Sequence, residues 1–173
     1  MADEFVTQQD PGGVSVIGGT IVPFGPTEIL GRKSDSFETE ILKLFFQAVS
    51  IGGLAINATA SPLTNIYIAT HTADPGEAGT AVTNESAFTG YARVAVARST
   101  AGWTVTGNQA SNAAAVTLPR CTGGTETITH VSIVDTASGA GRIFYSEALG
   151  QSVGMTGGIQ LTFPVGALVV TEE

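Results

Sequence analysis

Residues 35–51 show a helical pattern, because apolar side chains recur every three or four positions. This spacing places several of them on one expected face: Phe37, Ile41, Leu44 with Phe45, and Ala48 with Val49. Leu42 and Phe46 widen that face beyond what an isolated surface helix needs. We therefore expect the helix to pack on a sheet or on another subunit.

The ends of this helix are predicted from capping residues. Asp35 is the expected N-cap, because Glu38 follows three residues later, as a capping box requires. Gly52-Gly53 is expected to end the helix, since glycine is common just past a helix C-terminus.

From residue 54 onward the apolar period changes to two, which is typical of β-strands. Gly, Pro, Asn and Asp separate the apolar runs, and no helical pattern intervenes. The expected strands are 66–70, 91–98, 103–106, 113–118, 128–134, 142–148, 159–163 and 167–171. This spacing favours a mainly β fold, an antiparallel β-sandwich or jelly-roll preceded by one helix. Within 91–98, Arg93 and Arg98 are expected on opposite faces, so they should not form one basic patch.

Residues 1–33 form a separate region, in which prolines and glycine pairs interrupt regular structure. Many of the remaining positions are nevertheless apolar, too many for a plain linker. We expect an extended N-terminal arm at 1–33 and a helix plus β domain at 34–173. The arm would lie on its own body or on a neighbouring subunit, and an extra edge strand on its own domain is an equal alternative. The candidate assembly interface combines arm and helix residues: Val14, Val16, Ile21, Val22, Phe24, Phe37, Ile41 and Phe45.

The chain is acidic and rich in small and apolar residues. Its 173 residues carry a net charge of −8, which argues against a nucleic-acid partner. Only 13% of residues are charged and 43% are hydrophobic, which excludes a disordered acidic tail and a coiled coil. No apolar run reaches the length of a membrane span, and the acidic N-terminus lacks the features of a signal peptide. We therefore expect synthesis in the cytoplasm. The single cysteine, Cys121, allows no internal disulfide.

The search for chemistry finds few candidates. His71 is interpreted as a turn residue whose imidazole caps a loop amide, and His130 as a partly exposed strand residue. His71 with Asp74 and Glu77 is only a loose metal-ligand set, and Asp74 is better explained as capping the Pro75-Gly76 turn. We expect no catalytic residues, no cofactor and no metal, and hence a structural or binding role.

Two alternatives remain at this stage. A carbohydrate-binding β-sandwich would expose Trp103 or Tyr91 as a possible ligand surface for a host-surface glycan. An enzyme on a jelly-roll would need His71 and His130 to converge with acidic residues.

Six segments, in this order, resemble a family of tailed-bacteriophage virion structural proteins that are tail-fibre-like. They are FETEILKLFF (37–46), IYIATHTADPGEAGT (66–80), YARVAVAR (91–98), SNAAAVTLP (111–119) and THVSIVDTASGAGRIFYSEAL (129–149), followed by GIQLTFPVGALVVT (158–171). The resemblance covers about residues 37–173, and residues 1–33 depart from it.

The resemblance implies a non-enzymatic component of the virion, made in the host cytoplasm. Tail- or tail-fibre-associated positions fit it, and capsid decoration or neck positions are alternatives. It also implies other virion proteins as partners and assembly as several copies. A homo-oligomer is expected from the wide helix face and the arm as well, and a trimer is the working hypothesis.

Overall fold

The computed structural model describes residues 14–17, 20–23, 34–52 and 62–172. The chain divides into two compact units, Met1–Arg32 and Lys33–Glu173, and each is described by itself. In the first unit, β1 (Val14–Ile17) pairs antiparallel with β2 (Thr20–Pro23), and Val16 lies opposite Ile21. The described part of the expected arm is therefore a short hairpin rather than one extended strand.

In the second unit, α1 spans Asp35–Gln47. Its N-cap is Ser34 and not Asp35, because the extended backbone of Ser34 lets its Oγ accept a hydrogen bond from the N–H of Phe37 at 3.4 Å. The helix ends at Ala48, whose φ of 58° is left-handed, so the prediction that the glycine pair stops it was also wrong.

The face that α1 buries differs from the expected one. Leu42 and Phe46 are completely buried, and Glu38, one turn earlier, is nearly so. Phe37, Ile41 and Phe45 lie one position before these three and remain partly exposed. Leu42 and Phe46 were expected only to widen the apolar face, but they form its buried centre, and Phe45 packs against the core beside them.

All strands of the second unit pair antiparallel, which confirms the mainly β fold with one helix. The larger sheet has the order β4 (Val94–Ala97), β3 (Asn65–His71), β8 (Glu126–Val134), β9 (Ile143–Met155). A three-stranded sheet has the order β11 (Val169–Thr171), β6 (Gln109–Asn112), β5 (Trp103–Thr106). A short pair joins β7 (Val116–Thr117) to β10 (Thr162–Phe163).

Among the described strands of the second unit, only β5 has the predicted bounds. β6 was missed, β4 begins at Val94 rather than at residue 91, and β9 is 13 residues long. The pairing of β9 with β8 is interrupted by a bulge. Val153 pairs with Ile128 and Ala148 pairs with His130, so residues 149–152 of β9 face only Thr129 of β8.

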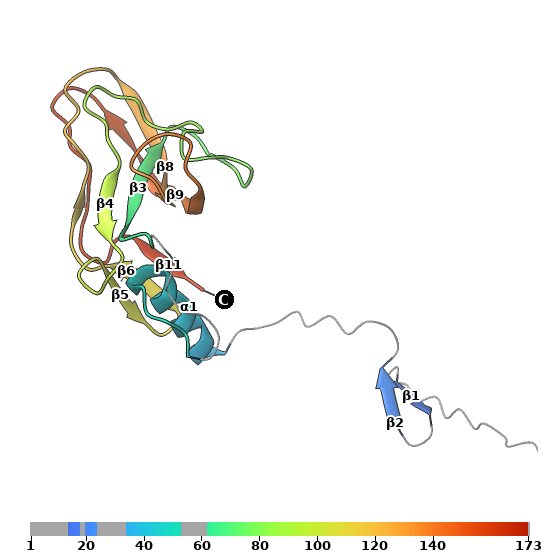
Figure 1. The fold of residues 1–173 in the computed structure, drawn as a ribbon. Coiled ribbons are helices and arrows are strands. Elements are labelled where there is room, and N and C mark those ends of the chain that lie inside the picture. The colour runs from blue at the N-terminus through green and yellow to red at the C-terminus, as the bar shows by residue number, and fades with distance from the viewer. Residues whose placement is uncertain (1–13, 18–19, 24–33, 53–61, 173) are drawn as a thin grey trace, which may run out of the picture. The chain divides into compact units, whose positions relative to one another are not determined.

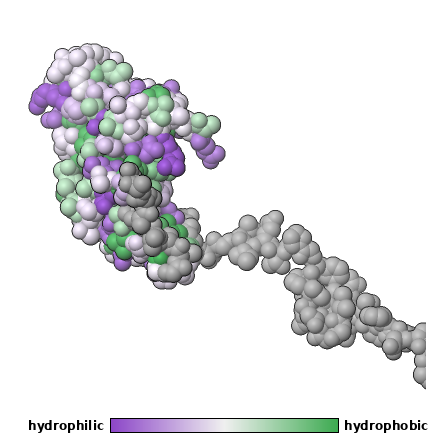
Figure 2. All heavy atoms as spheres, viewed as in Figure 1, coloured by the Kyte–Doolittle hydropathy of each residue, from purple (hydrophilic) through white to green (hydrophobic). Residues whose placement is uncertain are grey.

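The main hydrophobic core joins the two larger sheets and the helix. Ile66 and Ile68 of β3 and Ile133 of β8 contribute from the larger sheet, and Trp103 contributes from β5. Phe46 of α1 packs on Trp103, with ring centroids 4.5 Å apart. Figure 1 shows α1 beside β5, β6 and β11, which fits the expectation that the helix packs on a sheet. On the face seen in Figure 2, strongly hydrophilic residues form separate small clusters rather than one charged patch.

Candidate functional site

Polar side chains gather on one face of β3 and β8, where the segment after β3 folds back over the sheet. His71, the last residue of β3, lies opposite His130 of β8. The backbone of His71 also forms an isolated antiparallel β-bridge with the backbone of Glu85. The N–H of Ser86 donates to the carbonyl of Thr70 at 2.8 Å. Residues 83–86 thus cover the end of β3. We call His71, Glu85, Tyr91, Arg93 and Ser132 the buried polar cluster.

His71 is completely buried, with a partner at each ring nitrogen. Its Nδ1 is 2.9 Å from the carbonyl oxygen of Thr83, and its Nε2 is 2.7 Å from Ser132 Oγ. Because a carbonyl only accepts, Nδ1 carries the proton and Nε2 accepts from the Ser132 hydroxyl. Burial lowers the pKa of His71 below its usual 6.5, which favours this neutral ring. The interpretation as a turn residue was wrong, because β3 continues through His71, which pairs through its backbone with Glu85.

The contact between Ser132 and His71 has the geometry of a nucleophile and its base. The two histidines also lie together, as the enzyme alternative required. However, Ser132 is only 1% exposed, and the imidazole is oriented by a backbone carbonyl rather than a carboxylate. A substrate carbonyl could not reach Ser132 Oγ in this arrangement. The contact instead links β3 to β8, while the Nδ1 contact with the Thr83 carbonyl holds residues 83–86 to the sheet.

Arg93 and Glu85 form the charged half of the cluster. Arg93 Nε donates to Glu85 Oε1 at 2.6 Å, and Arg93 Nη2 donates to Glu85 Oε2 at 2.8 Å. The Arg93 side chain is 2% exposed, and the hydrogen bonds that it donates to Glu85 raise its pKa above the usual range. The pair is thus bidentate and nearly dry, the geometry in which losing one partner costs most.

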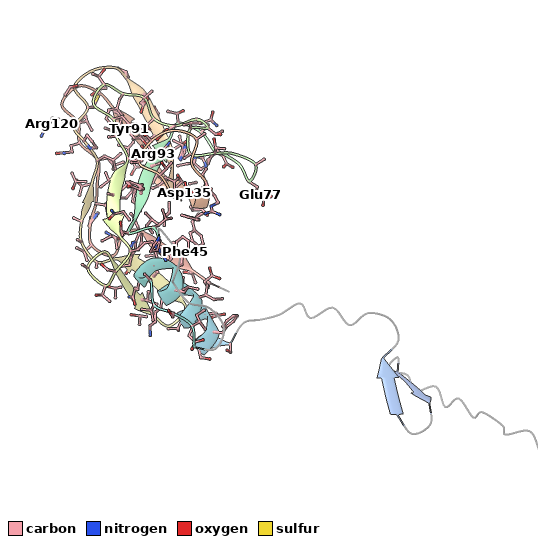
Figure 3. The ribbon with its side chains drawn as sticks, viewed as in Figure 1. Phe45, Glu77, Tyr91, Arg93, Arg120 and Asp135 are labelled. Carbon is pink, nitrogen blue, oxygen red and sulfur yellow. The ribbon has the colours of Figure 1, made fainter. Side chains whose placement is uncertain are left out.

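Tyr91 and the β8–β9 connection complete the network. The Tyr91 hydroxyl donates to Glu85 Oε1 at 2.9 Å, and burial raises the pKa of this hydroxyl. Arg93 also donates to the carbonyls of Thr136, at 3.0 Å, and Gly139, at 2.8 Å. Figure 3 shows Tyr91, Arg93 and Asp135 in the same part of the unit. The network therefore ties three segments that resemble the phage family to one another.

The second arginine of the 91–98 segment has other partners. Arg98 donates to the carbonyls of Phe45 and Leu44, at 2.6 and 2.8 Å, at the C-terminal end of α1. A cation there satisfies carbonyls that lack partners within the helix. Arg93 and Arg98 thus serve separate places, as predicted.

The two candidate sugar-stacking aromatics do not form a surface. Trp103 is completely buried, which contradicts its place on a ligand surface, and its Nε1 has no hydrogen-bond partner among the described residues. Tyr91 is partly buried and packs edge-on against Phe88, at 5.4 Å between ring centroids. Its hydroxyl is held by Glu85, so it offers no free polar tip to a sugar.

The candidate assembly residues lie in different places. Val14, Val16, Ile21 and Val22 belong to the β1–β2 hairpin of the first unit, and Phe24 lies outside the described residues. Phe45 packs edge-on against Phe144 and Tyr145 of β9, at 4.7 and 5.6 Å. Phe37 and Ile41 are partly exposed. No contact between subunits tests this set, so the assembly interface stays a prediction.

A groove that the sequence did not reveal lies between β9 and the segment before and within β11. Its volume is about 240 Å³. Ile133, Tyr145, Leu149, Phe163, Leu168 and Val169 are among the residues that line it. The lining is mainly apolar, with Glu147 among its polar members. The one signal in the sequence was the long uncharged run after Glu147, which continues β9 beyond the predicted strand.

Within the described residues, no group of three or more His, Cys, Asp or Glu is placed to hold a metal ion. The described part of the chain includes no helix with the length and apolar character needed to cross a membrane. Cys121 is buried, and its Sγ donates to the carbonyl of Gly123 at 3.3 Å.

Comparison with known proteins identifies the β domain. The family described as Podophage GP4 fiber I protein gp80 matches residues 33–171. No curated protein matches the chain. The match covers most of the sequence and confirms the resemblance to a phage tail-fibre-like family. The chain belongs to the family of the podophage GP4 fiber I protein gp80.

Proposed function

We propose that this protein is a structural subunit of a bacteriophage tail fibre, whose residues 1–32 attach the β domain to other virion proteins and to further copies of the chain. Membership of a phage fibre family supports a tail-fibre-associated structural role and a place in the virion. The same family favours the tail over capsid decoration or the neck.

One observation supports different roles for residues 1–32 and for the β domain. The family match begins at residue 33, and the second compact unit begins at Lys33. Residues 1–32 are therefore outside both the family domain and the unit that holds the main core. A segment of this kind is free to make contacts that the domain does not need for its own folding.

The chemistry of residues 1–32 supports attachment. Residues 11–27 contain no Asp, Glu, Lys or Arg, although the whole chain has a net charge of −8. Strands of this character bind proteins by adding to the edge of a sheet, where backbone hydrogen bonds supply affinity. The acidic β domain would keep the free subunit soluble before assembly.

The test compares the full chain with residues 33–173. We expect the shorter protein to keep the circular dichroism of a folded β domain and to have a single-subunit mass by light scattering, while the full chain forms oligomers. Equal masses for the two proteins, or an unfolded 33–173, would contradict the proposal. Light scattering of the full chain also tests the trimer hypothesis.

A further inference from the structure

The groove beside β9 has the features of a site for another strand. It opens between β9 and β11, which are outermost strands of their sheets: among the described strands, each pairs with a single neighbour. Such edges present unpaired backbone N–H and C=O groups. Val169 of β11, which lines the groove, is 51% exposed. Backbone partners and apolar contact are thus available in the same place.

The size and lining of the groove favour side chains over a small molecule. Its volume of about 240 Å³ lies below the roughly 300–1,000 Å³ of typical small-molecule sites. Few polar groups converge on it to orient a ligand. An extended peptide needs only pockets for alternate side chains together with a strand edge.

Gly150 adds an independent observation. It lies in the irregular part of β9 and lines the groove. Its φ is outside the left-handed region, and a Cβ built on it would meet no atom within 4 Å. The subunit alone therefore does not need glycine at this position. Glycine inside a strand often marks a place where another backbone approaches closely.

We propose that the groove between β9 and β11 receives the strand-forming segment Val14–Pro23 of a neighbouring copy. This inference rests on the proposed function and names the acceptor of the N-terminal segment. Val14–Pro23 is uncharged and forms strands that, among the described residues, pair only with each other. Residues 24–33, if fully extended, would span at most about 33–36 Å, which sets an upper limit on the distance between the donor domain and the groove.

Cross-linking between separately labelled full-length chains tests the inference. Cys121 is first replaced by alanine, and Val16→Cys is then made in one population and Val169→Cys in another. Mixing the two under oxidising conditions should give a disulfide-linked pair of chains. Val82→Cys is the matched control, because Val82 is a valine of similar exposure, 46%, that does not line the groove. Its mixture with the Val16→Cys chains should give only background cross-linking.

A second pair of variants tests the role of the glycine. Gly150→Leu should leave the unfolding transition unchanged and reduce the Val16–Val169 cross-link to the level of the Val82 control. Gly157 has similar open space and lies outside the groove, so Gly157→Leu should keep the cross-link.

Three results would overturn the inference. They are equal cross-linking at Val169 and Val82, full cross-linking in Gly150→Leu, and, in a further variant that carries both Val16→Cys and Val169→Cys, a disulfide that forms only within the chain. These failures are distinguishable from failure of the proposed function. If the full chain forms oligomers that residues 33–173 do not, but Val169 fails to cross-link, only the acceptor site is wrong.

Discussion

Replacing Arg93 with alanine is the sharpest test of what holds the β domain together. The change leaves Glu85 and the carbonyls of Thr136 and Gly139 without their shared donor. Removing one partner of a buried ion pair typically costs about 3–5 kcal/mol, because a desolvated charge remains unpaired. For a protein of this size, that corresponds to a melting temperature lower by roughly 6–20 °C.

The structure supplies a matched control in a second Arg–carboxylate pair. Arg142 Nε lies 3.7 Å from Asp135 Oδ2, and the Arg142 side chain is 70% exposed. Solvent screens such a pair, so Arg142→Ala should cost only about 0–1 kcal/mol.

The assay is urea denaturation followed by circular dichroism, with the midpoint compared at unchanged slope. A double-mutant cycle with Glu85→Ala should show strong coupling, because Glu85 and Arg93 contact each other directly. If Arg93→Ala and Arg142→Ala lower the free energy of unfolding equally, the assignment of the cluster as a major stabilising element is refuted.

Three further predictions address the helix and the buried histidine. Leu42→Ala should lower the free energy of unfolding by about 2–5 kcal/mol and Ile41→Ala by clearly less, since only Leu42 is completely buried. Thermal melts of both variants test this assignment of the buried helix face, and equal losses would contradict it. Ser34→Ala should lower the free energy of unfolding, measured by chemical denaturation, by about 0.5–2 kcal/mol through loss of the N-cap. An unchanged free energy of unfolding would contradict the assignment of Ser34 as the N-cap. Because burial lowers the pKa of His71, the unfolded chain binds a proton more readily than the folded chain does. The free energy of unfolding should therefore fall as pH drops below about 6.5, and His71→Asn should weaken this pH dependence. Parallel curves of unfolding free energy against pH for the two proteins would contradict the prediction.

The sequence pattern predicted much of the fold because most strands are short runs rich in Val, Ile, Thr and aromatic residues between turn-forming residues. β5 was predicted at its observed bounds, and β3 and β8 nearly so. β6 escaped prediction because only Ala110 among its residues is apolar. It forms because β5 and β11 pair with it on both sides, and local sequence carries no signal for that tertiary pairing.

The polar cluster could not be predicted from spacing. His71 precedes Asp74-Pro75-Gly76, which correctly indicates a turn, but burial comes from residues 83–86 folding back. Ser132 meets His71 only through the register of β3 with β8. Aromatic strand residues such as Trp103 suit both core and sugar-binding positions, and packing against Phe46 places Trp103 in the core.

The most direct test of the central claim is quantitative mass spectrometry of purified virions that carry this protein with residues 2–32 deleted. We expect the shortened protein to be soluble and folded in infected-cell lysate, yet strongly depleted from particles relative to the full-length chain. Particles that hold it at the normal copy number would contradict the claim that the N-terminal segment attaches the fibre domain.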